Sequence, residues 1–198
     1  MSMKKEKIAK GIRVLSVPPV MVSVMILILA RVRGEIFRNT DEIIVTLLLL
    51  GIVPVLAYPM QHFIKGLRKQ GREGQRKLAF VCSLIGYTAA FLWSLGTGVM
   101  SQLRLICNTY FFSVVLLTFC NKVLHFRASG HACSFTGPLL LLIYFVGYQV
   151  ILPCVAAAAL ILWSSLYLKR HTAKELLGGM GVCVVAFTLA MLVLQLGT

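Results

Sequence analysis

Two histidines and one glutamate are the residues of this chain whose types and spacing best suit catalysis. His131 follows a Ser-Gly pair, and His171 precedes Glu175 by four residues. An imidazole can act as a covalent nucleophile or as a general acid or base. Side chains four residues apart at the start of a helix lie on one face, so Glu175 can reach the imidazole of His171 and fix its tautomer. The chain therefore contains the groups that nucleophilic and acid–base catalysis require.

The segments around the two histidines resemble signatures of the type 2 phosphatidic acid phosphatase superfamily. Residues 127–132 (Arg-Ala-Ser-Gly-His-Ala) are similar to its second signature, Pro-Ser-Gly-His. Residues 164–179 resemble its third signature, which runs Ser-Arg, five residues, His, three residues, Asp, often before a Leu-x-Gly stretch. The two matches occur in the family's order, at predicted membrane boundaries. The resemblance implies a six-helix membrane core over most of residues 40–198.

The chain departs from the family pattern at four positions. The first signature, Lys, six residues, Arg-Pro, has its best match at Lys65 and Arg72, but Glu73 replaces the proline and two spans separate it from the second signature. Ala128 replaces the proline of the second signature, and Glu175 replaces the aspartate of the third. Ser165 replaces the third signature's arginine. Ser cannot bind phosphate as a guanidinium fork does, so this last change bears most on activity.

The resemblance implies an integral membrane phosphatase that hydrolyses a lipid phosphate or polyprenyl diphosphate without metal or cofactor. His171 is the expected nucleophile, Glu175 its orienting carboxylate and His131 the general acid. Phosphoryl transfer spreads negative charge over several oxygens, so nearby cations and N–H groups stabilise its transition state. The expected phosphate-binding groups are the Ser129-Gly130 backbone at a helix N-terminus and the side chains of Arg127, Lys65 and Arg72, with Arg170 or Lys169 in place of the missing arginine.

The elements that must position these residues are transmembrane helices. Of the 198 residues, 59% are hydrophobic and only 13% are charged, whereas soluble domains carry about 25% charged residues. Long runs rich in Leu, Val, Ile and Ala lack the alternation of barrel strands. The sequence therefore predicts a single all-α membrane domain over residues 1–198.

The apolar runs predict seven spans, a bundle of six to seven helices. We place them at about 13–32, 43–63, 78–98, 102–124, 133–149, 150–168 and 176–197. The first span lacks an Ala-x-Ala-like cleavage site, so we expect a retained helix. Residues 132–168 are too long for one span at about 1.5 Å per residue. We therefore predict a hairpin near Gly147, with Pro153 opening the next helix.

The charge distribution predicts the orientation. With a cytoplasmic N-terminus, the seven spans leave 16 of the 20 Lys and Arg residues on the inner side, a strong positive-inside bias. The polar segments 64–77, 122–132 and 164–175 then share one face, where we expect the site. We therefore expect a multi-pass protein of the cell membrane that contacts the bilayer and does not bind nucleic acid. The lipid substrate is what the family resemblance implies.

Several alternatives stay open. The basic segment 64–77 could serve topology or lipid headgroup binding, and Glu175 could be a carboxylate favoured by the helix dipole. The Gly178-Gly179-Met180-Gly181 cluster favours close helix packing. Cysteine spacing does not suggest a zinc site. A degenerate relative that binds a lipid headgroup or protein without turnover is the main alternative function, and a small transporter is a further one.

Overall fold

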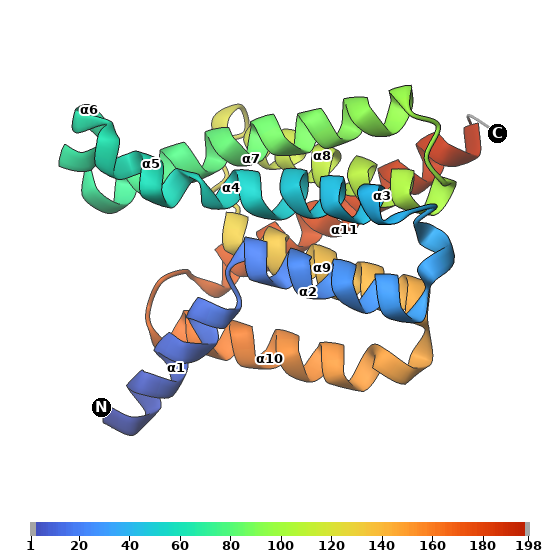
Figure 1. Ribbon diagram of the computed structural model, residues 1–198. Helices are drawn as coiled ribbons and strands as arrows, with labels where there is room; N and C mark the ends of the chain where they lie inside the picture. Colours follow the sequence, from blue (N-terminus) through green and yellow to red (C-terminus); the bar gives the residue numbers. More distant parts are fainter. Residues whose placement is uncertain (1–2, 197–198) are drawn as a thin grey trace.

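The protein folds as a bundle of helices, shown in Figure 1 as a computed structural model. It describes residues 3–196, without the side chains of Lys65, Leu67 and Arg72, and this part of the chain contains helices and no strand. The helices are α1 (Met3–Leu15), α2 (Pro18–Val32), η1 (Gly34–Ile36), α3 (Thr40–Thr46), η2 (Leu47–Ile52), α4 (Val53–Val55), α5 (Ala57–Phe63), α6 (Lys65–Lys69), α7 (Gly71–Gly96), α8 (Ser101–Lys122), α9 (Gly130–Val146), η3 (Tyr148–Val150), α10 (Ile151–Tyr167) and α11 (Ala173–Leu196).

The predicted helical membrane bundle is confirmed. Four segments are long and apolar enough to cross a membrane: Glu73–Gly96, Ser101–Lys122, Tyr148–Tyr167 and Ala173–Leu196. Two bent pairs, α1 with α2 and Thr40–Val55 with α5, raise the number to as many as six within the described residues. The predicted span 133–149 corresponds to α9, an apolar helix of only 17 residues. The structure thus supports four to six spans and not the full seven, in a multi-pass membrane protein.

The first predicted span is divided near its start. It was expected to run from residue 13 to 32, but α1 ends at Leu15 and α2 begins at Pro18, with a bend of 61° between them. Pro18 and Pro19 occupy the first turn of α2. Proline fits there because the first N–H groups of a helix have no intrahelical partner, but it cannot continue a preceding helix. The bend directs α1 away from α2 toward α10, against which it packs.

The break between α9 and α10 lies where the sequence predicted it. Gly147 has φ +92°, a conformation that favours glycine, and it follows the last residue of α9. Its N–H donates to the Ile143 carbonyl at 3.0 Å. Pro153 falls in the first turn of α10. The two helices form the expected hairpin (Figure 1).

The core lies between α2, α7, α8, α9 and α11. The helices α8 and α11, α9 and α11, α7 and α8, and α2 and α9 pack against one another. From α2, the side chains of Val22, Met25, Ile26 and Leu29 are completely buried in this core. The helix α2, which precedes the family-like core predicted over residues 40–198, therefore contributes to the buried core.

The polar segments gather at one end of the bundle. In Figure 1, α1, α5, α6 and the connections from α8 to α9 and from α10 to α11 lie toward the left. The segment 64–77, expected to be a polar loop, is instead mostly helical, because α6 covers residues 65–69 and α7 begins at Gly71. The other two predicted loops shorten to residues 123–129 and 168–172.

Glycines in α11 allow the second and third signature segments to approach. A Cβ atom at Gly179 would collide with the Ser129 carbonyl oxygen and would lie 2.9 Å from the Ala132 Cβ. A Cβ atom at Gly178 would collide with the Phe126 ring. The predicted role of this glycine cluster in close helix packing is confirmed, and it places α11 directly against the start of α9.

Candidate active site

The start of α11 is organised by a reciprocal cap. The Glu175 backbone N–H donates to the Thr172 hydroxyl oxygen at 3.2 Å, and the Thr172 backbone N–H donates to Glu175 Oε2 at 3.2 Å. This is the capping-box arrangement, in which an N-cap residue and the third helical residue satisfy each other's backbone donors. The cap fixes the carboxylate of Glu175 at the end of the bundle that carries the polar segments.

The same carboxylate binds His171. Nδ1 of His171 lies 3.2 Å from Glu175 Oε2, and the two side chains are 16% and 19% exposed. Burial lowers the pKa of His171 below its ordinary value. Glu175 raises this pKa, and the charges of Arg13 and Arg76 lower it further. A neutral imidazole donates its Nδ1–H to the carboxylate, so Nε2 keeps its lone pair. The geometry therefore gives His171 the tautomer that a nucleophile requires.

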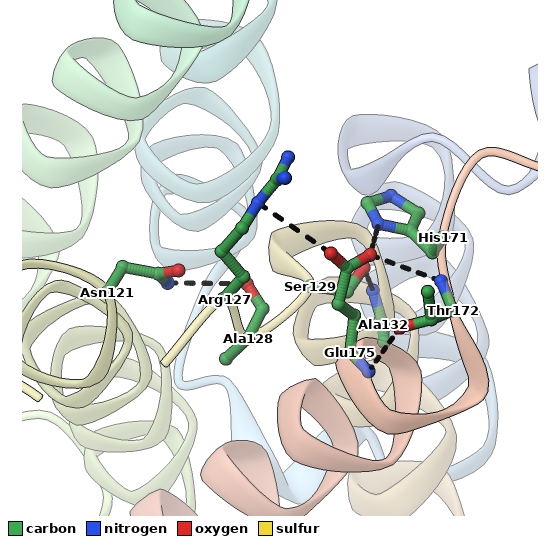
Figure 2. Close-up of polar contacts among 8 residues, drawn as sticks. All are labelled: Asn121, Arg127, Ala128, Ser129, Ala132, His171, Thr172 and Glu175. Carbon is green, nitrogen blue, oxygen red and sulfur yellow. Dashed lines mark hydrogen bonds and ion pairs between the residues drawn. The ribbon is translucent and has the colours of Figure 1, made fainter. Parts of the chain in front are cut away.

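Glu175 has three polar partners in this position. Its carboxylate accepts from the Thr172 N–H and contacts the side chains of His171 and Arg127. Nε of Arg127 lies 3.7 Å from Glu175 Oε1. Figure 2 shows the carboxylate between the guanidinium of Arg127 and the ring of His171. One carboxylate thus connects residues of the second and third signature segments.

A backbone hydrogen bond joins the two segments as well. The Ser129 N–H donates to the Glu175 carbonyl at 2.9 Å. The Ser129 hydroxyl accepts from the Ala132 N–H at 3.2 Å and caps α9. The Ser129 N–H is therefore engaged within the protein, whereas its hydroxyl, which accepts from Ala132, keeps its own O–H to donate. Gly130, exposed in the first turn of α9, is the remaining backbone candidate.

Two hollows flank the carboxylate. A groove of about 310 Å³ is lined by His125, Phe126, Arg127, Thr172, Lys174 and Glu175. A smaller hollow of about 20 Å³ is lined by Arg76, Asn121, Arg127, Ala128, His171 and Glu175. The smaller hollow has room for about one water molecule, so a phosphate group beside His171 requires a side chain to move. The Arg127 side chain is 77% exposed and can turn outward.

The predicted cations are only partly brought together. Arg127 lines both hollows. The side chains of Lys65 and Arg72 lie outside the described residues. Lys169 and Arg170 are exposed. Neither residue is among the described residues that line the two hollows. The structure therefore gives no support to a replacement arginine at position 170.

The second imidazole, His131, lies at the N-terminal end of α9. Its Nε2 is 3.4 Å from the Ser16 hydroxyl oxygen, and that hydroxyl donates to the Arg13 carbonyl at 3.3 Å. Burial lowers the pKa of His131, with further lowering by Arg13 and His171. His171 thus lies within electrostatic range of His131, as expected for two groups of one site. The lowered pKa leaves His131 neutral near pH 7, whereas a general acid must carry a proton.

Ser165 is completely buried at the end of α10. Among the described residues its hydroxyl has no hydrogen-bond partner, while its carbonyl accepts from the Arg170 N–H at 3.0 Å. Position 165, where the third signature has arginine, is therefore enclosed within the protein. Its neighbour Ser164 donates to the Ala9 carbonyl of α1 at 2.7 Å.

Sequence reasoning missed four residues of this region. Arg76 and Asn121 line the smaller hollow. Ser16, directly after α1, contacts His131, and the charge of Arg13 in α1 acts on both histidines. Arg76 follows Arg72 by one turn of α7, so the helical period of this segment would have indicated it had the segment been recognised as helical. Nothing in the local pattern around Arg13 separates it from the lysines before it.

Among the described residues, no group of three or more His, Cys, Asp or Glu side chains is placed to hold a metal ion. Comparisons with protein-family models, with curated proteins and with solved structures find no match to this chain.

Proposed function

We propose that this chain is a membrane phosphatase that transfers the phosphoryl group of a lipid phosphate or polyprenyl diphosphate to His171 and then to water. The hydrogen bond from His171 Nδ1 to Glu175 carries the proposal, because it leaves Nε2 as a nucleophile beside a cation-lined hollow. The membrane setting favours a substrate whose phosphate lies at the headgroup level.

The reaction has two steps. In the first, Nε2 of His171 forms a bond to phosphorus while the bond from phosphorus to the leaving oxygen breaks, and His131 gives a proton to that oxygen. In the second, water attacks the phosphohistidine, His131 accepts its proton and inorganic phosphate leaves. Glu175 stabilises the imidazole as charge develops on it. Arg127 and Arg76, which line the smaller hollow, would stabilise the charge on the phosphoryl oxygens.

His131 needs a proton before the first step. Burial disfavours that proton most, and the charge of Arg13 and the nearby His171 disfavour it further. A phosphate dianion between the histidines would oppose this repulsion and raise the pKa of His131. Substrate binding would therefore supply the general acid in its active form.

The experiment is phosphate release from purified protein in detergent, with excess chelator. Phosphatidic acid and a long-chain polyprenyl diphosphate are the two substrate classes. We expect turnover that persists in chelator, is inhibited by vanadate, and passes through an acid-labile phosphoenzyme. A strict requirement for a divalent metal, or a phosphoenzyme that forms without His171, would overturn the mechanism.

A binding protein without turnover is the second candidate. The observations in its favour are the serine in the family's arginine slot and the small volume of the hollow beside His171. This candidate predicts saturable binding of a lipid phosphate with no phosphate release from either substrate class.

A further inference from the structure

The N-terminal helix contributes one face to the site. Ala9 of α1 and Ser16, the residue that directly follows α1, are buried, and Arg13 of α1 is half-buried between them. The positions i, i+4 and i+7 lie on one face of a helix. Two of these three positions contact the bundle directly, because the Ala9 carbonyl accepts from Ser164 at 2.7 Å and the Ser16 hydroxyl lies 3.4 Å from His131 Nε2.

The cations of α1 divide into two groups. Lys4, Lys5, Lys7 and Lys10 are exposed, and Lys10 pairs with Glu6 at 2.8 Å. Arg13 instead lies on the buried face, with its Nη1 atom inaccessible to solvent. Arg13 is therefore distinct from the surface lysines.

The helix also docks where the third signature departs from its family. Ser164, which bonds to Ala9, immediately precedes Ser165 on α10. Arg13 lies one turn after Ala9 on α1. Arg13 therefore belongs to the helix that packs against the segment in which serine stands at position 165.

We propose that Arg13 is a phosphate-binding residue of this site and takes the place of the arginine that Ser165 replaces. The inference rests on the proposed function for its substrate, although it requires only that a phosphate group binds. Arg13 and Arg127 then approach the phosphoryl oxygens from opposite segments, α1 and the α8–α9 connection. Arginine suits this position because its planar fork can bind two oxygens at once.

The electrostatics of both histidines agree with this placement. The charge of Arg13 contributes to the lowered pKa of His131, together with burial and His171. The pKa of His171 is likewise lowered by burial, Arg13 and Arg76, while Glu175 raises it. A phosphate that both imidazoles flank would therefore lie within the electrostatic field of the same guanidinium.

Three variants test the inference: Arg13→Ala, Arg13→Lys and the matched control Lys10→Ala. The first readout is binding of inorganic phosphate and vanadate to the full chain in detergent. We expect affinity to fall about 10- to 100-fold for Arg13→Ala, the range for a hydrogen bond to a charged group. Arg13→Lys keeps the charge but not the fork, so an intermediate loss is expected. Lys10→Ala should stay within about twofold of wild type.

The second readout is the titration of histidines labelled with ¹⁵N and assigned by single substitution. Removing the positive charge of Arg13 should raise the pKa of His131 and of His171, and Lys10→Ala should leave both close to their wild-type values. A merely structural role would not move these values in the direction of a lost cation. Arg13→Lys should preserve them, which keeps the test valid if Arg13→Ala fails to fold.

Unchanged phosphate affinity in both Arg13→Ala and Arg13→Lys would overturn the inference, as would an unchanged titration of His131 in Arg13→Ala. Failure of the proposed function looks different. In that case wild-type protein releases no phosphate from either lipid class, while Arg13→Ala still weakens the binding of inorganic phosphate.

Discussion

Two helices at opposite ends of the bundle begin with the same local device, and only one of them forms a candidate site. At the start of α3, the Asn39 side chain accepts from the Glu42 N–H at 2.9 Å, and Glu42 Oε2 accepts from the Arg38 N–H at 2.8 Å. At the start of α11, Thr172 and Glu175 form the corresponding pair. Glu42 is 8% exposed, and its carboxylate takes part in the cap of α3. That of Glu175 also contacts His171 and Arg127.

The difference between these ends comes from neighbours and not from the caps. Near Glu175, His171 precedes the cap and the start of α9 lies beside it. Arg76 and Arg127 line the adjacent hollow, and the charge of Arg13 acts on His171. At the opposite end, Arg33 pairs with Glu35 at 2.5 Å and donates to the Phe145 carbonyl, so its charge holds helix ends together. A carboxylate in a helix cap thus becomes a candidate catalytic group only where the tertiary fold brings an imidazole and a hollow beside it.

The largest expected effect is at His171. His171→Ala should reduce phosphate release by about 10⁴-fold or more, because it removes the proposed nucleophile. The measurement is turnover of phosphatidic acid and a polyprenyl diphosphate in chelator. His62→Ala is the control, since His62 is exposed on α5 and contacts only the Tyr58 carbonyl, at 3.2 Å, in the described hydrogen bonds. Substantial turnover by His171→Ala would show that another group attacks phosphorus.

Glutamine substitutions at the two caps compare the ends directly. Glu175→Gln should lower turnover by about 10³- to 10⁴-fold, as loss of an orienting carboxylate does elsewhere. Glu42→Gln should leave turnover close to wild type and reduce stability by about 0.3–1 kcal/mol through the loss of a charge at a helix N-terminus. Equal losses of turnover in both variants would contradict the distinction between the two ends.

The pH dependence sharpens the same comparison. His171 must be neutral to attack, and its pKa lies below the ordinary 6.5. The acid limb of kcat/KM should therefore fall below pH 6.5, with activity lost as His171 becomes protonated. Glu175 raises the pKa of His171, so Glu175→Gln should move this limb to still lower pH. An acid limb that moves to higher pH would show that another group titrates.

A smaller effect is expected from single arginines at the two ends. Arg127→Ala should weaken phosphate binding and raise KM about 10-fold or more, because a charge-assisted hydrogen bond contributes about 1.5–3 kcal/mol. Arg38→Ala should change neither, since only the backbone N–H of Arg38 takes part in its cap. Steady-state kinetics with vanadate inhibition would measure both. A similar KM for the two variants would remove Arg127 from the site.

The smallest effect separates adjacent serines of α10. Ser164→Ala removes the hydrogen bond to Ala9 that holds α1, and should lower Tm by about 2–4 °C for a loss of about 1 kcal/mol. Ser165→Ala removes a hydroxyl without a partner among the described residues and should leave Tm unchanged or slightly higher. Thermal unfolding in detergent would measure the two. A larger loss at Ser165 would place its hydroxyl in a contact that matters to the fold.

The sequence alone determined the features that depend on composition or on neighbours within one helical turn. Scarce charge and long apolar runs specified a helical membrane bundle, because the bilayer leaves the backbone few other ways to satisfy its hydrogen bonds. The glycine cluster of α11 predicted close packing. The pairing of His171 with Glu175 followed from their spacing of four residues at a helix start.

The tertiary structure decided what joins segments far apart in the chain. The bend of 61° after α1, the approach of Arg13 and Ser16 to His131, and the use of both polar groups of Ser129 in caps and cross-links depend on which helices become neighbours. A basic run gives every Lys and Arg the same local signal. Which cation becomes buried depends on the helices that pack around it, because these helices desolvate its charge. The local sequence does not specify those helices.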